Sequence, residues 1–227
     1  MYNIIFNFTG LYEEMNFGPA DFITHDLKGM RGTELYIDEE AEEKLLCLIG
    51  EYSINGIHLL DNGNYHYVTR LFLHHINEDF DLIYCDNHSD DQAPAFEGIK
   101  SCGSWVMDAR KELAHRMKST CWINGKGEAV IYGVPSKDRP VYLSIDKDVL
   151  DKAVAPTNWD QGELKLDSLL ELIERLLDGR TLIGVDICGE CLYENGRASS
   201  EDIMTNEKVD NYLIKYFFQR IKAENHG

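Results

Sequence analysis

The chain has 227 residues, of which 44% are hydrophobic and 27% are charged, and its formal net charge is -18. This acidic balance repels phosphate backbones and anionic lipids, so we expect neither nucleic acid nor a membrane surface as a partner. The sequence shows no repeat, low-complexity stretch or proline-rich linker, which favours a single domain spanning residues 1–227. It also lacks a secretory signal and any run near the roughly 18 apolar residues of a membrane span, which predicts a cytoplasmic protein.

Short apolar runs alternate with segments of helical periodicity along the chain. The predicted strands are Tyr2–Phe8, Gly56–Leu60, Leu82–Cys85, Ala129–Tyr132, Val141–Ile145 and Leu182–Ile187, and the predicted helices are Glu39–Ile49, Tyr67–Ile76, Ser104–Met117, Leu166–Leu177 and Val209–Ile221. Strands that are apolar throughout and alternate with helices are typical of a parallel sheet covered on both faces. In such α/β sheets, sites form beyond the C-terminal ends of the strands.

A first polar cluster follows the predicted strand Leu82–Cys85. It contains Asp86, His88 and Asp90. Successive side chains of an extended segment point to opposite sides, so these three side chains are predicted to face one way. Carboxylates and an imidazole form the mixed oxygen and nitrogen shell that a hard or borderline divalent ion prefers.

Two further clusters follow predicted strands. Asp146 and Asp148 stand two residues apart, and such close carboxylates raise each other's pKa unless a cation lies between them. Lys147 is expected to point the other way, so a metal ion is the expected counter-charge. His66 follows a turn rich in glycine and asparagine, at the start of a predicted helix. Acidic residues are common in loops and at helix N-caps, but three such clusters at strand ends together predict a site for two metal ions.

In their order along the chain, these clusters resemble the motifs of the ureohydrolase superfamily, which includes arginase, agmatinase and formiminoglutamase. The family signature is Gly-Gly-Asp-His, Asp-x-His-x-Asp and Ser-x-Asp-x-Asp. The corresponding segments here are Gly63-Asn64-Tyr65-His66, Asp86-Asn87-His88-Ser89-Asp90 and Ser144-Ile145-Asp146-Lys147-Asp148. The resemblance implies an arginase-like fold with three layers, α/β/α, around a central and mostly parallel sheet.

The resemblance also implies a dinuclear centre with two Mn²⁺ ions per chain. The implied ligands are His66 and Asp90 on the first ion, His88 and Asp148 on the second, and Asp86 and Asp146 as bridges. A hydroxide held between the ions would attack the carbon of a guanidino or amidino group and cleave a linear C–N bond. Asp90 would accept a hydrogen bond from this hydroxide and pass its proton on.

The implied substrate is a small cationic guanidino or amidino compound. The chain is shorter than typical family members, which suggests an open site that could instead admit an arginine side chain within a peptide. The family also implies a homo-oligomer.

Other positions depart from the family pattern. Cys102 stands where the family has a histidine thought to shuttle protons, and a thiol can act as an acid or base when its pKa is suitably shifted. The family's glutamate that binds the guanidinium comes one place later, as Glu190. We therefore expect Glu190 to bind the cationic end of the substrate. Trp159, in an altered loop, either lines a pocket or packs the loop onto the core.

Two alternatives remain at this point. A zinc deacetylase-like amidohydrolase would use one metal ion and a His-His pair in a loop, whereas His74-His75 lies within a predicted helix. A non-catalytic metal-binding protein of the same fold would explain the missing histidine and the altered loop. Cys188-x-x-Cys191 is a lone motif of its kind, which could be redox-active or half of a zinc site.

Overall fold

The computed structural model describes residues 1–18, 20–94, 98–192 and 198–224. In these residues eight strands form one sheet, in the order β2-β1-β4-β10-β9-β5-β7-β8. The strands are β1 (Asn3–Asn7), β2 (Phe22–Asp26), β4 (Ile57–Leu59), β5 (Phe80–Cys85), β7 (Met117–Ile123), β8 (Ala129–Gly133), β9 (Val141–Asp146) and β10 (Leu182–Cys188). Every neighbouring pair in this described sheet is parallel apart from β7 and β8.

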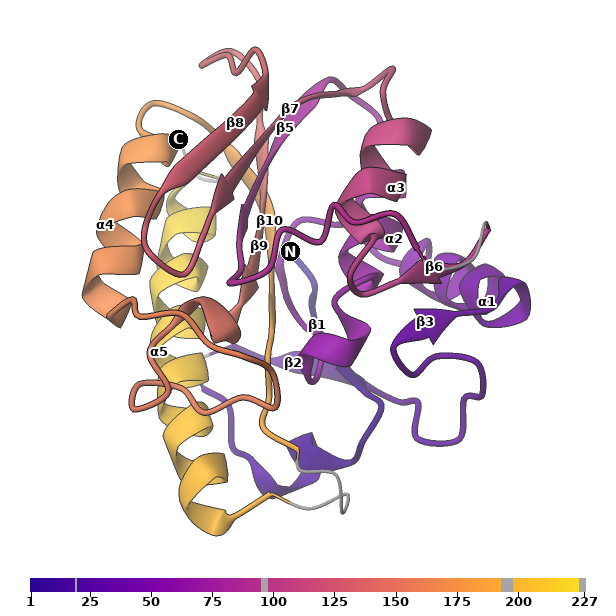
Figure 1. The fold of residues 1–227 in the computed structure, drawn as a ribbon, viewed down its shortest axis with the longest axis vertical. Coiled ribbons are helices and arrows are strands. Elements are labelled where there is room, and N and C mark those ends of the chain that lie inside the picture. Colours follow the sequence, from indigo (N-terminus) through magenta and orange to yellow (C-terminus); the bar gives the residue numbers. More distant parts are fainter. Residues whose placement is uncertain (19, 95–97, 193–197, 225–227) are drawn as a thin grey trace.

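Helices cover both faces of the sheet, which gives the predicted three layers (Figure 1). One face carries α1 (Glu39–Ile49), α2 (Val68–His74) and α3 (Trp105–Glu112), and the other carries α4 (Leu166–Leu177) and α5 (Ser200–Glu224). The short 3-10 helices are η1 (Leu11–Glu14), η2 (Gly63–Tyr65) and η3 (Lys147–Val149), and β3 (Tyr36–Ile37) pairs with β6 (Lys100–Ser101) in a separate two-stranded sheet. The α/β/α fold expected from the sequence is confirmed.

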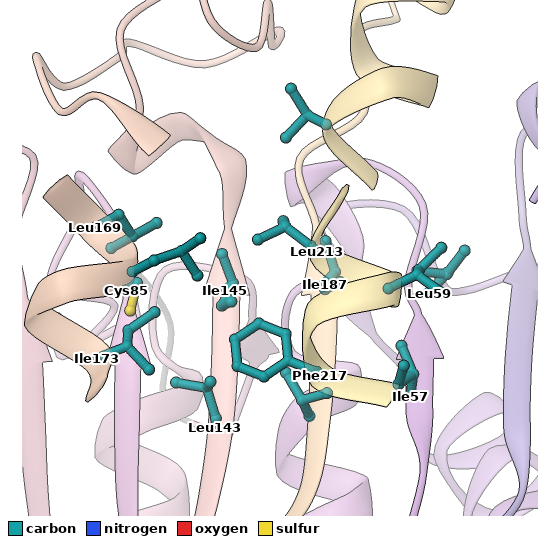
Figure 2. Close-up of a cluster of buried hydrophobic side chains, with 14 of the residues drawn as sticks. Ile57, Leu59, Cys85, Leu143, Ile145, Leu169, Ile173, Ile187, Leu213 and Phe217 are labelled. Carbon is teal, nitrogen blue, oxygen red and sulfur yellow. The ribbon is translucent and has the colours of Figure 1, made fainter. Parts of the chain in front are cut away.

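Alternation along the central strands decides which side chains meet which helices. In β9, Leu143 and Ile145 pack against α4 and α5, where Phe217 joins them (Figure 2). Tyr142, between them, packs with α1, α2 and α3 on the opposite face. Burying each of these large side chains contributes about 1.5–3 kcal/mol. The same alternation directs Asp146, at the end of β9, toward the face that carries α1, α2 and α3.

The structure differs from the predicted elements at both edges of the sheet, since the edge strand β2 was not predicted. The run Ala129–Tyr132, predicted as a buried strand, is the antiparallel edge strand β8, and Ile131 and Tyr132 are 49% and 48% exposed. The helix predicted over Ser104–Met117 ends at Glu112, because Met117 begins β7. Strand β7 escaped prediction because polar residues interrupt its apolar pattern.

Among the described helices, none combines the length and the apolar character needed to cross a bilayer.

Candidate metal centre

Three strand ends bring the predicted ligands to one edge of the sheet. β5 and β9 are parallel neighbours paired through Cys85 and Ile145, so Asp86 and Asp146 lie next to each other just beyond these residues. Asp148 lies in η3, directly after β9, and His66 follows η2 after β4. The fold therefore places all three clusters at the C-terminal end of the sheet, where α/β proteins form their sites.

A tight turn, and not strand alternation, shapes the segment after β5. The backbone N–H of His88 donates to Asp86 Oδ1 at 2.6 Å, and that of Asn87 donates to Asp148 Oδ1 at 2.9 Å. Asp90 has φ of 47°, in the left-handed region that few residues other than glycine adopt. The prediction of an extended segment with three side chains on one side was therefore wrong in its geometry, although the side chains do converge.

His66 is the centre of the first group of ligands. It is buried, and its Nδ1 lies 3.0 Å from Asp86 Oδ2 and 3.2 Å from Asp90 Oδ2. Asp146 Oδ2 is 3.6 Å from the same nitrogen. Within the described residues, Nδ1 has no hydrogen-bond partner of suitable geometry. A buried nitrogen that faces three carboxylates without bonding to them is the arrangement expected around a metal ion.

A chain of hydrogen bonds behind His66 sets its tautomer. Ser144 Oγ donates to Asp186 Oδ1 at 2.6 Å and lies 2.9 Å from His66 Nε2. Because the Ser144 hydroxyl proton is used by Asp186, Nε2 carries the proton that binds Ser144, so Nδ1 is the nitrogen that can bind a cation once it gives up its own proton. Such support of the second ring nitrogen is typical of histidine metal ligands. Without a cation, burial lowers the pKa of His66, but the surrounding thiol and carboxylates raise it well above its usual value.

The second group of ligands shares Asp86 with the first. His88 Nδ1 lies 2.8 Å from Asp148 Oδ2 and 3.6 Å from Asp86 Oδ1. The two oxygens of Asp86 thus face different histidines, Oδ2 toward His66 and Oδ1 toward His88. A carboxylate placed in this way can bridge two metal ions.

The carboxylates of the site have histidines, but no lysine or arginine, as cationic neighbours among the described residues. Burial, followed by the charge of Asp148, raises the pKa of Asp146 to about 7, and burial with the charge of Asp86 does the same for Asp148. Burial also raises the pKa of Asp90. In the described residues the ion pairs of these four groups involve histidine alone. The donor set therefore fits one or more divalent cations.

A cavity of about 170 Å³ opens onto these candidate ligands. Its lining comprises Gly63, Asp86, His88, Asp90, Gln92, Cys102, Gly103, Asp146, Asp148 and Trp159. Gly63 allows a close approach, because a Cβ there would lie 2.9 Å from Asp146 Oδ2. Trp159 stands with its ring centroid 5.8 Å from that of His88, and its Nε1 donates to Asn64 Oδ1 at 3.0 Å. Trp159 thus lines the pocket, which was one of the two predicted alternatives.

Cys102 lies in the cavity wall, as expected for a residue at the family's histidine position. Burial, and then the charge of Asp90, raises the pKa of its thiol to about 12. The thiol is therefore neutral near pH 7 and can donate a hydrogen bond, but it is a poor base.

The structure places Glu190 away from the cavity, which contradicts its predicted role in substrate binding. Its carboxylate is fully buried and accepts from Lys147 Nζ, which also donates to Asp210 of α5 at 2.7 Å. Gly189, with φ of 96°, precedes it, and a Cβ at this glycine would lie 2.5 Å from Asp146 Oδ1. The residue next to the site is thus a glycine, and the glutamate one place later turns to the opposite face.

Sequence reasoning missed the residues that support the ligands from β10. Asp186 pairs with Ser144 in the sheet register, and Cys188 pairs with Asp146. Cys188 Sγ donates to Asp146 Oδ2 at 3.2 Å. Side-chain alternation along β9 and β10 could have revealed these residues, but only with the knowledge that the two strands are neighbours. Cys188 and Cys191 are both buried, and neither forms a disulfide bond.

Comparison with known proteins gives the same assignment as the motifs. A model of the arginase family matches residues 81–190. An uncharacterized protein of Thermotoga maritima is 31% identical over 200 residues, which are 82% of this chain and 78% of that protein. The chain therefore belongs to the arginase family, within the ureohydrolase superfamily, as its three motifs predicted.

Solved structures confirm the fold. A hypothetical agmatinase from Burkholderia thailandensis is similar with a TM-score of 0.61 and 17% identity, covering 99% of this chain and 87% of that one. The formimidoylglutamase of Bacillus subtilis is similar with a TM-score of 0.62 and 11% identity, covering 95% of this chain and 87% of that one. At these identities the likeness concerns the architecture.

Proposed function

We propose that the protein is a hydrolase with two divalent metal ions that cleaves a linear C–N bond of a guanidino- or amidino-type substrate. The observation that carries this proposal is the placement of Asp86 between two histidines, one at each of its oxygens. A single-ion site would not require a second histidine and a second pair of carboxylates on the far side of Asp86.

The residues present divide naturally between two positions. His66 and Asp90 would hold one ion, His88 and Asp148 would hold the other, and Asp86 and Asp146 would bind both. Oxygen and imidazole ligands of this kind suit Mn²⁺. Two such ions would lower the pKa of a water molecule between them and stabilise the charge that develops on the substrate.

Asp90 is the residue we propose to move protons. Its Oδ2 accepts a hydrogen bond from Trp105 Nε1 at 2.7 Å, which fixes the carboxylate in its left-handed turn. A carboxyl group held against the reacting centre can accept a proton and pass it to the leaving nitrogen. The neutral thiol of Cys102, in the same wall, would act in this scheme as a hydrogen-bond donor.

Substrate recognition must work without Glu190. In the described part of the cavity wall, the carboxylates are those of the metal ligands, and Trp159 stands at the entrance beside His88. A planar guanidinium or amidinium group can stack on an indole ring through a cation–π interaction. The acidic field of a chain with net charge -18 would draw such a cation toward the cavity.

The test is a turnover screen with protein loaded with Mn²⁺. Free guanidino and amidino compounds and a peptide that contains arginine are incubated with the protein, and urea and ammonia are measured. Asp146→Asn serves as the control that disables both ion positions. We expect product from at least one compound with the native protein and none with the variant. Two bound ions without product from any compound would favour a non-catalytic metal-binding protein, whereas one tightly bound Zn²⁺ with no second ion of any kind would favour the deacetylase-like alternative.

A further inference from the structure

Cys188 lies directly against the metal ligands, although the motifs assign it no role. It is the last residue of β10, and its sheet partner on β9 is Asp146. Its side chain is 0% exposed, and its Sγ lies 3.2 Å from Asp146 Oδ2. Side chains two residues apart in a strand point to the same face of the sheet. Cys188 therefore lies on the same face of β10 as Asp186, which accepts a hydrogen bond from Ser144.

The surroundings of Cys188 form a ligand set in their own right. A ring nitrogen of His66, a carboxylate oxygen of Asp146 and the sulfur of Cys188 all lie within 4.8 Å of one another, and all three residues are buried. His66 Nδ1 lies 3.6 Å from Asp146 Oδ2 and has no hydrogen-bond partner of suitable geometry among the described residues. A cation that satisfies this nitrogen therefore also comes within reach of the sulfur.

We propose that Cys188 is a sulfur ligand of the ion held by His66 and Asp146. This inference rests on the proposed metal function and makes the two ion positions chemically different. The position that includes Cys188 contains a soft ligand and favours Zn²⁺ or Co²⁺ over Mn²⁺, because thiolates select such ions. The position formed with His88 and Asp148 has oxygen and nitrogen ligands and keeps its affinity for Mn²⁺. On binding, the Cys188 thiol releases its proton to solvent, as cysteine ligands do.

Cobalt provides a direct probe of the sulfur. Metal-free native protein is titrated with Co²⁺, and the near-ultraviolet absorbance is recorded, where a cobalt–thiolate bond gives an intense charge-transfer band. We expect the band in native protein and in Cys102→Ser, which removes the thiol in the cavity wall, but not in Cys188→Ser. Two Co²⁺ ions bound without the band would overturn the sulfur ligand and leave the proposed function intact. Loss of the band in Cys102→Ser alone would also overturn it, and failure to bind any metal would defeat both.

A measurement on folded native protein covers the case in which Cys188→Ser does not fold. X-ray absorption of the protein with one equivalent of Zn²⁺ should show a sulfur neighbour at about 2.3 Å, and Cys102→Ser should retain it. A shell of nitrogen and oxygen alone would refute the proposal. From an equimolar mixture of Zn²⁺ and Mn²⁺, native protein should take up more Zn²⁺ than Cys188→Ser does. Equal ratios of bound Zn²⁺ to bound Mn²⁺ in the two proteins would contradict the sulfur ligand.

Discussion

Two buried clusters of carboxylates lie on opposite faces of the sheet, beyond the same strand end. On one face Asp146 and Asp148 have no lysine or arginine partner among the described residues. On the other, Glu190 and Asp210 share the ammonium of Lys147, and all three side chains are essentially unexposed. Adjacent residues of one chain, Asp146 and Lys147, thus enter two different electrostatic environments.

The difference between these clusters separates a structural charge network from a site that needs a ligand. A buried carboxylate is costly unless it is paired, and the cluster around Lys147 contains its own cation. The cluster around Asp146 contains no lysine or arginine among the described residues, and burial together with the neighbouring carboxylates raises the pKa values of Asp146 and Asp148 to about 7. The first cluster holds α5 to the sheet, whereas the second is the cluster that we propose to bind cations.

The largest expected effect comes from removing the internal cation. Lys147→Met leaves two buried carboxylates without a partner and should lower the free energy of unfolding of the metal-free protein by about 3–5 kcal/mol. Urea unfolding in the presence of a chelator measures this. Lys137→Met is the matched control, because Lys137 is 71% exposed and pairs with Asp178 at the surface, so its effect should stay within about 0.5 kcal/mol. Equal effects of the two changes would argue against a structural role for the Lys147 cluster.

A substitution in the cluster around Asp146 should raise the free energy of unfolding of the metal-free protein, whereas Lys147→Met should lower it. Asp146→Asn removes a repelled buried charge, so at pH 8 the metal-free variant should be more stable than the native protein by about 2 kcal/mol. The variant should also lose the stabilisation that Mn²⁺ gives to the native protein. Urea unfolding with and without Mn²⁺ tests both statements. A metal-free variant as unstable as Lys147→Met would show that Asp146 is part of an internally paired network.

Support of His66 should matter for affinity. Ser144→Ala breaks the link from His66 Nε2 to Asp186 and should weaken Mn²⁺ binding by about 10–100-fold, as measured by calorimetric titration. Thr69→Val is the control, because Thr69 bonds Asp186 at 3.1 Å and its loss leaves the Ser144 link to His66 in place. Thr69→Val should therefore weaken Mn²⁺ binding less than Ser144→Ala does. Equal weakening by the two substitutions would show that the Ser144 link to His66 has no special role in metal binding.

Metal affinity should also depend on pH. The pKa values of Asp146 and Asp148 lie at about 7 in the metal-free protein, so below pH 7 these groups hold protons that an ion must displace. Mn²⁺ affinity should therefore fall as pH decreases from 8 to 6, by about tenfold per pH unit for each displaced proton. Calorimetry in buffers of different ionisation enthalpy counts the protons released. Binding at pH 6 without proton release would contradict these raised pKa values.

The sequence predicted the layers and the convergence of the six candidate ligands because both depend on local patterns. Apolar runs mark buried strands, and strand ends with paired acidic residues such as Asp146 and Asp148 mark the rim of a parallel sheet. The helices Glu39–Ile49 and Leu166–Leu177 were predicted with their observed bounds, since their periodic apolar positions pack directly on the sheet.

The remaining features depend on neighbours that are distant in sequence. Ser144 and Asp186 support His66 only because β9 and β10 are adjacent and in register, which no local pattern reveals. The direction of the Glu190 side chain depends on the left-handed conformation of Gly189. Where the chain leaves a strand, a shift of one residue turns a side chain to the opposite face of the sheet. The left-handed turn at Asp90 likewise depends on bonds that Asp90 accepts from Trp105 and Val106 of α3.

The most direct test of the central claim is the metal content of the native protein and of Asp146→Asn after equilibrium dialysis against Mn²⁺ and Zn²⁺ at pH 8. Our account predicts two ions per chain in the native protein, retained after removal of free metal, and a loss of bound metal in the variant. At most a trace of metal in well-folded native protein would contradict it.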